Sequence, residues 1–346
     1  MKRKLYNIRS REILEKNLAK ENLERITLSF YKYINIKSPD ELRDQIYAEW
    51  EDLSVLGRIY ISKEGINAQI SIPKINLKKF EKTMNKYAFL KKTNIKYAVK
   101  EGISFYKLKI KIKNEIVSYG IEDSEYDMST VGKHLTASEF NNEIEKSDTV
   151  VVDIRNNYES EIGHFKGAIL PDVERSQEML PEVKKMLKGK EKNKVLLYCT
   201  GGIRCEKASS YLIKNGFTDV NQLKGGIIEY ANQMKEKGEK GKFIGKNFVF
   251  DERLGEEITS DIISSCHICK EPSNTHRNCS NKFCHILFIQ CKTCNNKLDG
   301  CCSTKCLNFK NLTNEEKEKE KEKFILYLEK RNKGKIKPRL DEIINN

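Results

Sequence analysis

The stretch KVLLYCTGGIRC, residues 194–205, decides the fold of the central part of this chain. It begins with an apolar run that is typical of a buried parallel strand, passes through two glycines and continues as a helix. Residues 149–154 form a second apolar run, and a polar loop and a helical pattern follow each of the two. This alternation predicts an α/β domain built on a parallel sheet.

The loop behind this strand predicts a nucleophile inside an anion cradle. Cys199 stands at the carboxyl end of the strand, where open α/β sheets form ligand sites. Loop amides and the amino end of the helix should stabilise its thiolate, and Arg204 adds a fixed positive charge. Cys205 is either a resolving thiol for a persulfide or disulfide at Cys199, or a packed thiol. The cradle, whose glycines let the backbone wrap tightly, comprises Thr200, Gly201, Gly202 and Ile203.

A second motif lies upstream, with DIRNNYE at residues 153–159 and GHFKGA at residues 163–168. Together with the cysteine loop, it resembles the rhodanese domain in residues and in spacing. The resemblance implies that Cys199 carries sulfur or acts as a nucleophile. The Cys-x4-Arg loop is smaller than the Cys-x5-Arg loop of cysteine phosphatases, so it should accept a persulfide sulfur and exclude a phosphate. Four polar residues are expected to orient the strands and the loop: Asp153, Arg155, Glu159 and His164. For His164, the role of a general base is the alternative.

The N-terminal part predicts a ferredoxin-like α+β domain with the order βαββαβ. Gly57 is expected to end the first helix. The last strand alternates apolar residues with four lysines, which indicate either an RNA-facing surface or a charged strand that protects a sheet edge from aggregation. The strands are expected at residues 25–34, 58–62, 66–72 and 105–113, and the helices at residues 38–56 and 74–89.

Nine of the eleven cysteines lie between residues 266 and 306, together with three histidines. In a cytosolic protein such crowding indicates metal binding, and two Cys-x2-Cys pairs favour structural zinc. An iron–sulfur cluster and a disulfide-linked module are the alternatives, and the sequence does not define which cysteines act together. The candidate ligands are Cys266, Cys269, Cys279, Cys284, Cys291, Cys294, Cys301, Cys302 and Cys306.

Length and charge complete the outline of a multidomain protein of mixed α/β and α+β class. The 346 residues carry a formal charge of +14. This charge indicates either a polyanionic partner such as RNA, or an organism whose proteins are generally rich in lysine. No apolar run is long enough to cross a membrane and the first residues lack a secretory signal, so we expect a cytoplasmic protein. The expected parts are a charged arm (1–24), the ferredoxin-like domain (25–125), the rhodanese domain (126–243), the cysteine-rich module (244–310) and a charged helical tail (311–346).

From about residue 25 to 310, the chain resembles the rhodanese-domain tRNA uridine hydroxylase family. The stretches that carry the resemblance are GRIY (57–60), EGINAQ (64–69), YCTGGIRCEKA (198–208), HILFIQC (285–291) and GCCS (300–303). The resemblance implies oxygen-dependent formation of 5-hydroxyuridine at the wobble uridine of tRNA, with molecular oxygen as co-substrate. The N-terminal domain is then expected to hold the anticodon stem-loop through Arg58, Tyr60 and Asn67, although surface packing and a hairpin turn explain these residues equally well.

We hypothesise that the Cys199 sulfur, as thiolate or persulfide, attacks carbon 6 of uracil, while Arg204 and the loop amides stabilise the developing charge. This mechanism requires an ionised sulfur that a base can reach. No nucleotide or flavin motif is evident, so the electron source is open, and a sulfur donor or reductant protein is a possible partner. The alternatives are a thiosulfate-type sulfurtransferase that carries a persulfide and a non-catalytic RNA-binding module.

Overall fold

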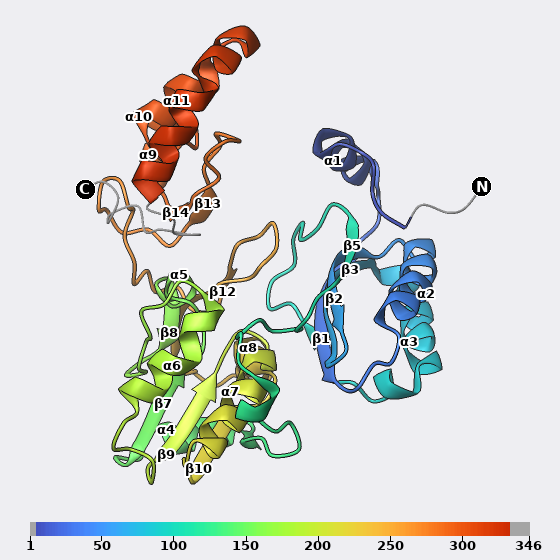
Figure 1. Ribbon diagram of the computed structural model, residues 1–346, viewed down its shortest axis with the longest axis vertical. Coiled ribbons are helices and arrows are strands. Elements are labelled where there is room, and N and C mark those ends of the chain that lie inside the picture. Colours follow the sequence, from blue (N-terminus) through green and yellow to red (C-terminus); the bar gives the residue numbers. More distant parts are fainter. Residues whose placement is uncertain (1–4, 333–346) are drawn as a thin grey trace.

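The computed structural model describes residues 5–332, and its N-terminal unit is a twisted sheet with helices on one face only (Figure 1). A short helix, α1 (Arg11–Lys20), precedes it. The sheet order is β4-β1-β3-β2-β5, with antiparallel neighbours except for the parallel pair β2 and β5. The elements are β1 (Arg25–Tyr33), α2 (Pro39–Asp52), β2 (Leu56–Ser62), β3 (Gly65–Pro73), α3 (Leu77–Lys86), β4 (Lys96–Tyr97) and β5 (Leu108–Ile112).

The predicted α+β fold of this unit is confirmed, but two details of the prediction were wrong. The first helix ends at Asp52, and Gly57 lies inside β2 with a φ of +153°, where a side chain would collide with the backbone of Gln69. The glycine therefore permits close approach of β2 and β3 and does not end a helix. The fourth strand of the pattern is the short β4, and the lysine-rich β5 is a fifth strand that pairs only with β2 in the described part of the chain.

Alternating side chains give this sheet two different faces. Leu28 and Phe30 of β1 join the aromatic and aliphatic core beneath α2 and α3, with Trp50 and Phe80. Their neighbours in β1, such as Tyr31, point to the opposite face, which the helices leave uncovered. That second face is turned toward the rest of the molecule.

The central unit confirms the predicted α/β domain with a parallel sheet. Its four strands follow the order β6-β10-β9-β7 and are all parallel. Helices α6 and α7 cover one face of the sheet, and α4 and α8 cover the other. The elements are β6 (Lys133–Leu135), α4 (Ala137–Ile144), β7 (Thr149–Asp153), α5 (Asn157–Ser160), β8 (Gly163–Phe165), α6 (Ser176–Met186), β9 (Lys194–Tyr198), α7 (Ile203–Lys214), β10 (Asp219–Leu223) and α8 (Gly226–Lys237).

The C-terminal unit continues from the central one through a small antiparallel sheet, in which β11 lies between β8 and β12. Its core combines cysteines with apolar side chains, and Phe324 of the last helix stacks on Phe309 at a centroid distance of 4.0 Å. The elements are β11 (Phe243–Asn247), β12 (Glu256–Glu257), β13 (His276–Asn278), β14 (Leu287–Ile289), α9 (Lys292–Leu298), α10 (Thr304–Asn311) and α11 (Asn314–Asn332).

Parts of the expected arm and tail, residues 1–4 and 333–346, lie outside the described residues. Within the tail, α11 buries Phe324 and Leu328, whereas Ile325 and Leu326 of the same helix remain exposed. None of the helices described is both long and apolar enough to cross a membrane.

Candidate active site at the junction of three units

The loop after β9 surrounds the sulfur of Cys199 with hydrogen-bond donors. The amide of Gly202 lies 3.1 Å from Sγ, and the amides of Arg204 and Cys205 also point at it. Burial opposes ionisation, but the hydrogen bond from the Cys205 thiol, the charge of Arg204 and these amides outweigh it and lower the pKa of Cys199 to about 6. At neutral pH the loop therefore holds a thiolate.

Cys205 is suited to donate to this thiolate. It is fully buried, and burial together with the adjacent Cys199 raises its pKa well above the ordinary value of a thiol. A thiol that stays protonated is a hydrogen-bond donor and a poor nucleophile. The resolving role expected for Cys205 remains a prediction, and it would require this pKa to fall during the reaction.

The two glycines of the loop have different reasons to be glycine. Gly202 has a φ of +93°, and a Cβ there would lie 3.0 Å from the hydroxyl of Tyr31 in the N-terminal unit. Gly201 has an ordinary φ, and its Cβ would meet only Cε of Lys96, at 3.7 Å. A third glycine, Gly226, brings the start of α8 against the loop, because its Cβ would lie 2.5 Å from the Cys199 carbonyl oxygen. Backbone geometry thus requires Gly202 and Gly226, and tolerates a methyl group at position 201.

Buried ion pairs hold the loop in place. The Arg204 guanidinium binds both oxygens of Glu159, at 2.6 and 2.9 Å, and also lies 3.3 Å from the Thr200 hydroxyl. Arg155 pairs with Asp153 at 2.7 Å and donates to the Gly163 carbonyl at 2.6 Å. Glu159 therefore neutralises much of the Arg204 charge, which the sequence had suggested was free to act on a substrate.

His164 lies apart from this chemistry. Its Nδ1 is 2.9 Å from the carbonyl oxygen of Ser160, and the described side chains that line the cavity beside the loop do not include it. This contact is compatible with the role of orienting the strands, and both roles named for His164 stay predictions.

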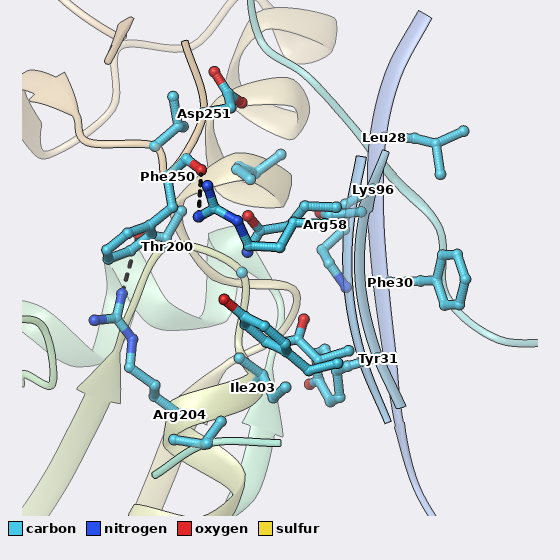
Figure 2. Close-up of a pocket in the computed structure, with 18 of the residues that line it drawn as sticks. Leu28, Phe30, Tyr31, Arg58, Lys96, Thr200, Ile203, Arg204, Phe250 and Asp251 are labelled. Carbon is cyan, nitrogen blue, oxygen red and sulfur yellow. Dashed lines mark hydrogen bonds between the residues drawn. The ribbon is translucent and has the colours of Figure 1, made fainter. Parts of the chain in front are cut away.

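A cavity of about 340 Å³ opens beside the cysteine loop, between the uncovered face of the N-terminal sheet and the central unit (Figure 2). All three RNA-binding candidates from the sequence, Arg58, Tyr60 and Asn67, line it. The C-terminal unit closes one side, and Arg58 donates to the carbonyl of Phe250 at 3.3 Å. From the central unit the cavity is lined by Asn156, Tyr158, Ser176, Thr200, Gly201, Ile203, Arg204 and Ile228.

Cys199 itself does not line this cavity, and none of its surface is exposed to solvent. The structure thus differs from the expectation that a base can reach the thiol directly. The physical reason is that the loop closes over the sulfur while Tyr31 and Lys96 lie against the loop from the other side of the cavity. Access requires that these groups move or that the sulfur is extended.

Tyr31 and Lys96 are residues that the sequence reasoning missed. The Tyr31 hydroxyl donates to Glu206 at 2.8 Å, and Glu206 also contacts Nε2 of His134 at 2.8 Å. Lys96 is buried, and its ammonium lies 4.6 Å from the centre of the Tyr31 ring. The alternation within β1 could have placed Tyr31 on the uncovered face, but no local signal marks Lys96.

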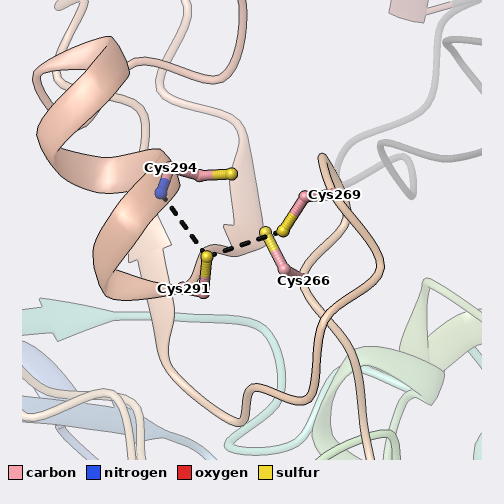
Figure 3. Close-up of side chains that lie close together, drawn as sticks. All are labelled: Cys266, Cys269, Cys291 and Cys294. Atoms are coloured by element: carbon pink, nitrogen blue, oxygen red, sulfur yellow. Dashed lines mark hydrogen bonds between the residues drawn. The ribbon is translucent and has the colours of Figure 1, made fainter.

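The cysteine-rich module contains two sets of four cysteines whose sulfurs lie close together. Figure 3 shows the first of these sets, which is formed by Cys266, Cys269, Cys291 and Cys294. In each set the four sulfurs lie within 4.8 Å of one another. Measured separations are 3.6 Å for Cys269–Cys291 and 3.7 Å for Cys284–Cys302. The first set is Cys266, Cys269, Cys291 and Cys294, and the second is Cys279, Cys284, Cys302 and Cys306, so Cys301 belongs to neither.

These separations identify the kind of group that fits. A tetrahedral ion with metal–sulfur bonds of about 2.3 Å holds its ligands about 3.8 Å apart. A disulfide needs a separation of about 2.05 Å, and a polynuclear cluster spreads its thiolates around bridging sulfides. All eleven cysteines are free thiols in the structure. Each set therefore fits one tetrahedral ion.

Comparisons with known proteins agree with this three-part architecture. Residues 25–116 match the UPF0176 acylphosphatase like domain, residues 136–233 the Rhodanese-like domain, and residues 244–307 the Rhodanase C-terminal family. A protein from Leptospira interrogans named tRNA uridine(34) hydroxylase is 52% identical over 345 residues, which cover 99% of this chain and 94% of the relative. This chain belongs to the tRNA uridine(34) hydroxylase family.

Further members of the family are also similar to this chain over most of its length. The relatives from Hamiltonella defensa and Photorhabdus laumondii, which carry the same name, are 46% and 45% identical. They cover 90% and 87% of this chain, and 88% and 86% of their own lengths. A solved rhodanese-like domain protein from Staphylococcus aureus is similar to 28% of this chain and 90% of its own, with 25% identity and a TM-score of 0.24. The family resemblance that the sequence motifs indicated is confirmed.

Proposed function

We propose that this protein hydroxylates uridine 34 of tRNA at carbon 5, with molecular oxygen as co-substrate. The observation that carries the proposal is the cavity in which a low-pKa cysteine loop faces a polar and aromatic sheet, in a chain of this family. Its volume of about 340 Å³ lies near the lower end of the range of small-molecule sites, about 300–1,000 Å³. That size suits a single nucleoside and not a folded RNA element. The anticodon base would therefore enter unstacked, with the rest of the stem-loop outside.

The cavity offers the contacts that a flipped pyrimidine needs. Tyr60 supplies an aromatic face on which a base can stack, and the amide of Asn67 can pair with the polar edge of uracil. Arg58 lies beside them in a position to contact a phosphate. These three residues came from the sequence as candidates, and their common place on one wall supports that assignment.

The burial of Cys199 favours a persulfide as the attacking form. A sulfane sulfur on Cys199 would extend the nucleophile by an S–S bond of about 2.05 Å, outward from the closed loop. Attack on carbon 6 forms an S–C bond and makes carbon 5 enolate-like, so that it can react with oxygen. Incorporation of one oxygen atom and reduction of the other to water consumes two electrons and two protons. A sulfur donor and a thiol or protein reductant are therefore expected partners.

The lysines of β5 extend the RNA-binding surface beyond the cavity. In the parallel register of β2 and β5, Lys109 lies opposite Arg58 and Lys111 lies opposite Tyr60, so their side chains share the face that lines the cavity. Both lysines are exposed, and desolvation together with the positive charge of Lys111 lowers the pKa of Lys109. The edge position and the RNA-binding role proposed for this strand are therefore compatible, and both fit an anticodon stem-loop laid across the sheet.

We propose further that each cysteine set holds one structural zinc ion. Thiolates bind zinc strongly and the sulfur separations match a tetrahedral site. Metal analysis of the purified protein should find two zinc ions per chain. Replacing Cys294 with serine should reduce this number, whereas replacing Cys301, which lies outside both sets, should leave it at two. A metal content that Cys294→Ser does not change would contradict this assignment.

The hydroxylation itself is tested by mass spectrometry of wobble nucleosides from cells that lack the gene. Restoration of 5-hydroxyuridine by the full chain supports the proposal. Loss and restoration of a thiolated nucleoside would instead identify a sulfurtransferase. If no nucleoside changes, the protein would be a non-catalytic RNA-binding module. Because tRNA is the proposed substrate, we propose that the reaction takes place in the cytoplasm.

A further inference from the structure

Lys96 reaches from the N-terminal unit to the cysteine loop across the cavity. It belongs to the two-residue strand β4 and is 3% exposed. Cε lies 3.7 Å from the position that a Cβ of Gly201 would occupy, and the ammonium lies over the Tyr31 ring. Figure 2 shows Lys96 on the cavity side of the sheet, opposite to Leu28 and Phe30.

The other cations of the cavity are already engaged. Arg204 forms a salt bridge with Glu159, and Arg253 forms salt bridges with Asp251 and Glu256. Arg58 is half-buried and donates to a backbone carbonyl. Within residues 5–332, the Lys96 ammonium forms no hydrogen bond or ion pair. It makes a cation–π contact with the Tyr31 ring.

A buried ammonium without a carboxylate partner is costly unless an anion is close by. Burial lowers the pKa of Lys96 to about 8, although the negative charges of Cys199, Glu229 and Glu206 act in the opposite direction. The thiolate has the largest effect among these three anions, and the interaction between the two charges is reciprocal. The cavity is thus arranged so that further negative charge above the loop would be stabilised by Lys96.

We propose that Lys96 completes the anion cradle of Cys199 and binds the uracil oxygen that becomes negative when sulfur attacks carbon 6. This assignment rests on the proposed hydroxylase function. In the attack, the S–C6 bond forms, the electron pair of the C5–C6 double bond forms a C4–C5 double bond, and the pair of the C4–O double bond moves onto the oxygen. No proton or electron is lost in this step. The ammonium takes the role of stabilising that oxygen, which the sequence had given to Arg204.

The N-terminal unit is then part of the catalytic centre and not only a platform for RNA. Because Lys96 and the cysteine loop belong to different units, the cradle is complete only when the sheet lies against the loop. Contacts on both sides maintain that position, including the hydrogen bond of Tyr31 to Glu206 and the salt bridges of Lys207 to Glu64 and Glu115.

The test compares Lys96→Gln, Lys96→Arg and Lys91→Gln in the full chain. Lys91 is exposed, belongs to the same unit and does not line the cavity, so it controls for loss of a lysine. In cells that lack the gene, Lys96→Gln should lower the rate of 5-hydroxyuridine formation by about 100-fold, the usual effect of removing one oxyanion donor. Lys96→Arg should restore part of the rate, and tRNA binding should not change.

A second measurement follows the sulfur alone. The folded chain is alkylated at several pH values, and mass spectrometry of the peptide that contains Cys199 measures the rate. The dependence of this rate on pH gives the pKa of the Cys199 thiol. Lys96→Gln should raise the pKa of Cys199, whereas Lys91→Gln should leave it unchanged. The other groups that face Lys96, which are Glu206, Glu229 and Tyr31, are the same in both variants. A structural defect would alter thermal stability and would not be rescued by arginine.

The outcomes separate the two proposals. If the wild-type chain restores no 5-hydroxyuridine, the hydroxylase proposal fails, and the alkylation profile still decides whether Lys96 belongs to the cradle. If the wild-type chain hydroxylates tRNA and Lys96→Gln matches it in rate and in the pKa of Cys199, the Lys96 assignment is overturned.

Discussion

The two walls of the cavity are built in different ways. One wall contains the loop behind which Cys199 is buried, and it is local, because the hydrogen-bond donors to the sulfur lie within a few residues of it in one loop and the start of one helix. The opposite wall is assembled from several strands, and its contacts with the loop join residues far apart in the chain, such as Tyr31 and Glu206 at a separation of 175. A reactive sulfur is thus encoded in one short segment, whereas the space in which it acts is encoded by the packing of whole domains.

The strongest test of the local wall is Cys199→Ser. This change removes the nucleophile and leaves the cavity-lining side chains in place, so 5-hydroxyuridine formation should fall by at least about 1,000-fold. Filter binding should show unchanged affinity for tRNA, because Cys199 has no exposed surface. Retained hydroxylation in this variant would show that the sulfur is not the reacting group.

The contact between the walls is tested by a matched pair of glycine variants. Gly202→Ala forces a side chain into a left-handed conformation and against the Tyr31 hydroxyl. The backbone strain alone costs about 1–2 kcal/mol, so modification should fall by about tenfold or more. Gly201 has an ordinary φ, and the methyl group that Gly201→Ala adds would contact only Lys96, at van der Waals distance. This variant should retain most of the activity, and equal effects of both substitutions would show that the contact is unimportant.

The hydrogen bond inside the loop is tested by the pH dependence of alkylation. In the wild type, the alkylation rate of Cys199 should reach half its maximum near pH 6. Cys205→Ala removes a hydrogen bond to a charged group, worth about 1.5–3 kcal/mol, and should raise this midpoint by about one to two pH units. An unchanged midpoint would mean that the backbone amides alone hold the thiolate.

The same thiol links the stability of the fold to pH. The pKa of Cys199 is depressed in the folded state, so its ionisation stabilises the fold fully above the pKa of an unfolded thiol, and this contribution is lost as pH falls to about 6. The difference in unfolding free energy between wild type and Cys199→Ser should therefore grow as pH rises from about 6 to about 9. Urea denaturation at several pH values measures this difference.

The smallest expected effect concerns the outer part of the sheet wall. Replacing Lys109 and Lys111 with glutamine should weaken tRNA binding by about three- to tenfold and reduce the salt dependence by the equivalent of about two phosphate contacts. Replacing Lys78 and Lys79 removes the same charge from α3, which covers the opposite face of the sheet. Equal losses from the two pairs would indicate a diffuse charge effect and not a binding track.

The difference between the walls also explains what the sequence could predict. The cysteine loop and its tendency to stabilise a thiolate follow from a short motif with fixed geometry, whereas the ion pair of Arg204 with Glu159 was not foreseen. Arg58, Tyr60 and Asn67 line the same cavity because residues two apart in a strand share a face and Asn67 lies opposite Tyr60 in the neighbouring strand. Their role in binding RNA is still a prediction.

Other features depended on packing that no local pattern reports. With two residues, β4 is too short to be recognised as a strand from the sequence. The sequence pattern therefore predicted the lysine-rich strand β5 as the fourth strand of the sheet. Lys96 was missed for the same reason, since its burial arises only where the first and second units meet. The grouping of the cysteines could not be read either, because the spacing within each pair does not define which pairs share an ion.

The order of those pairs has a consequence for how the C-terminal unit responds to metal loss. Along the chain the pairs alternate between the two sets. If each set holds the ion proposed for it, each ion closes a loop that contains a pair of ligands for the other, and the loss of one ion would loosen the second site. Strand β14 of this unit packs through Ile289 and Leu287 against Phe248, two residues before the Phe250 that borders the cavity. Zinc starvation would thus distort the substrate chamber from a distance, although no cysteine of the module touches it in the part of the chain described.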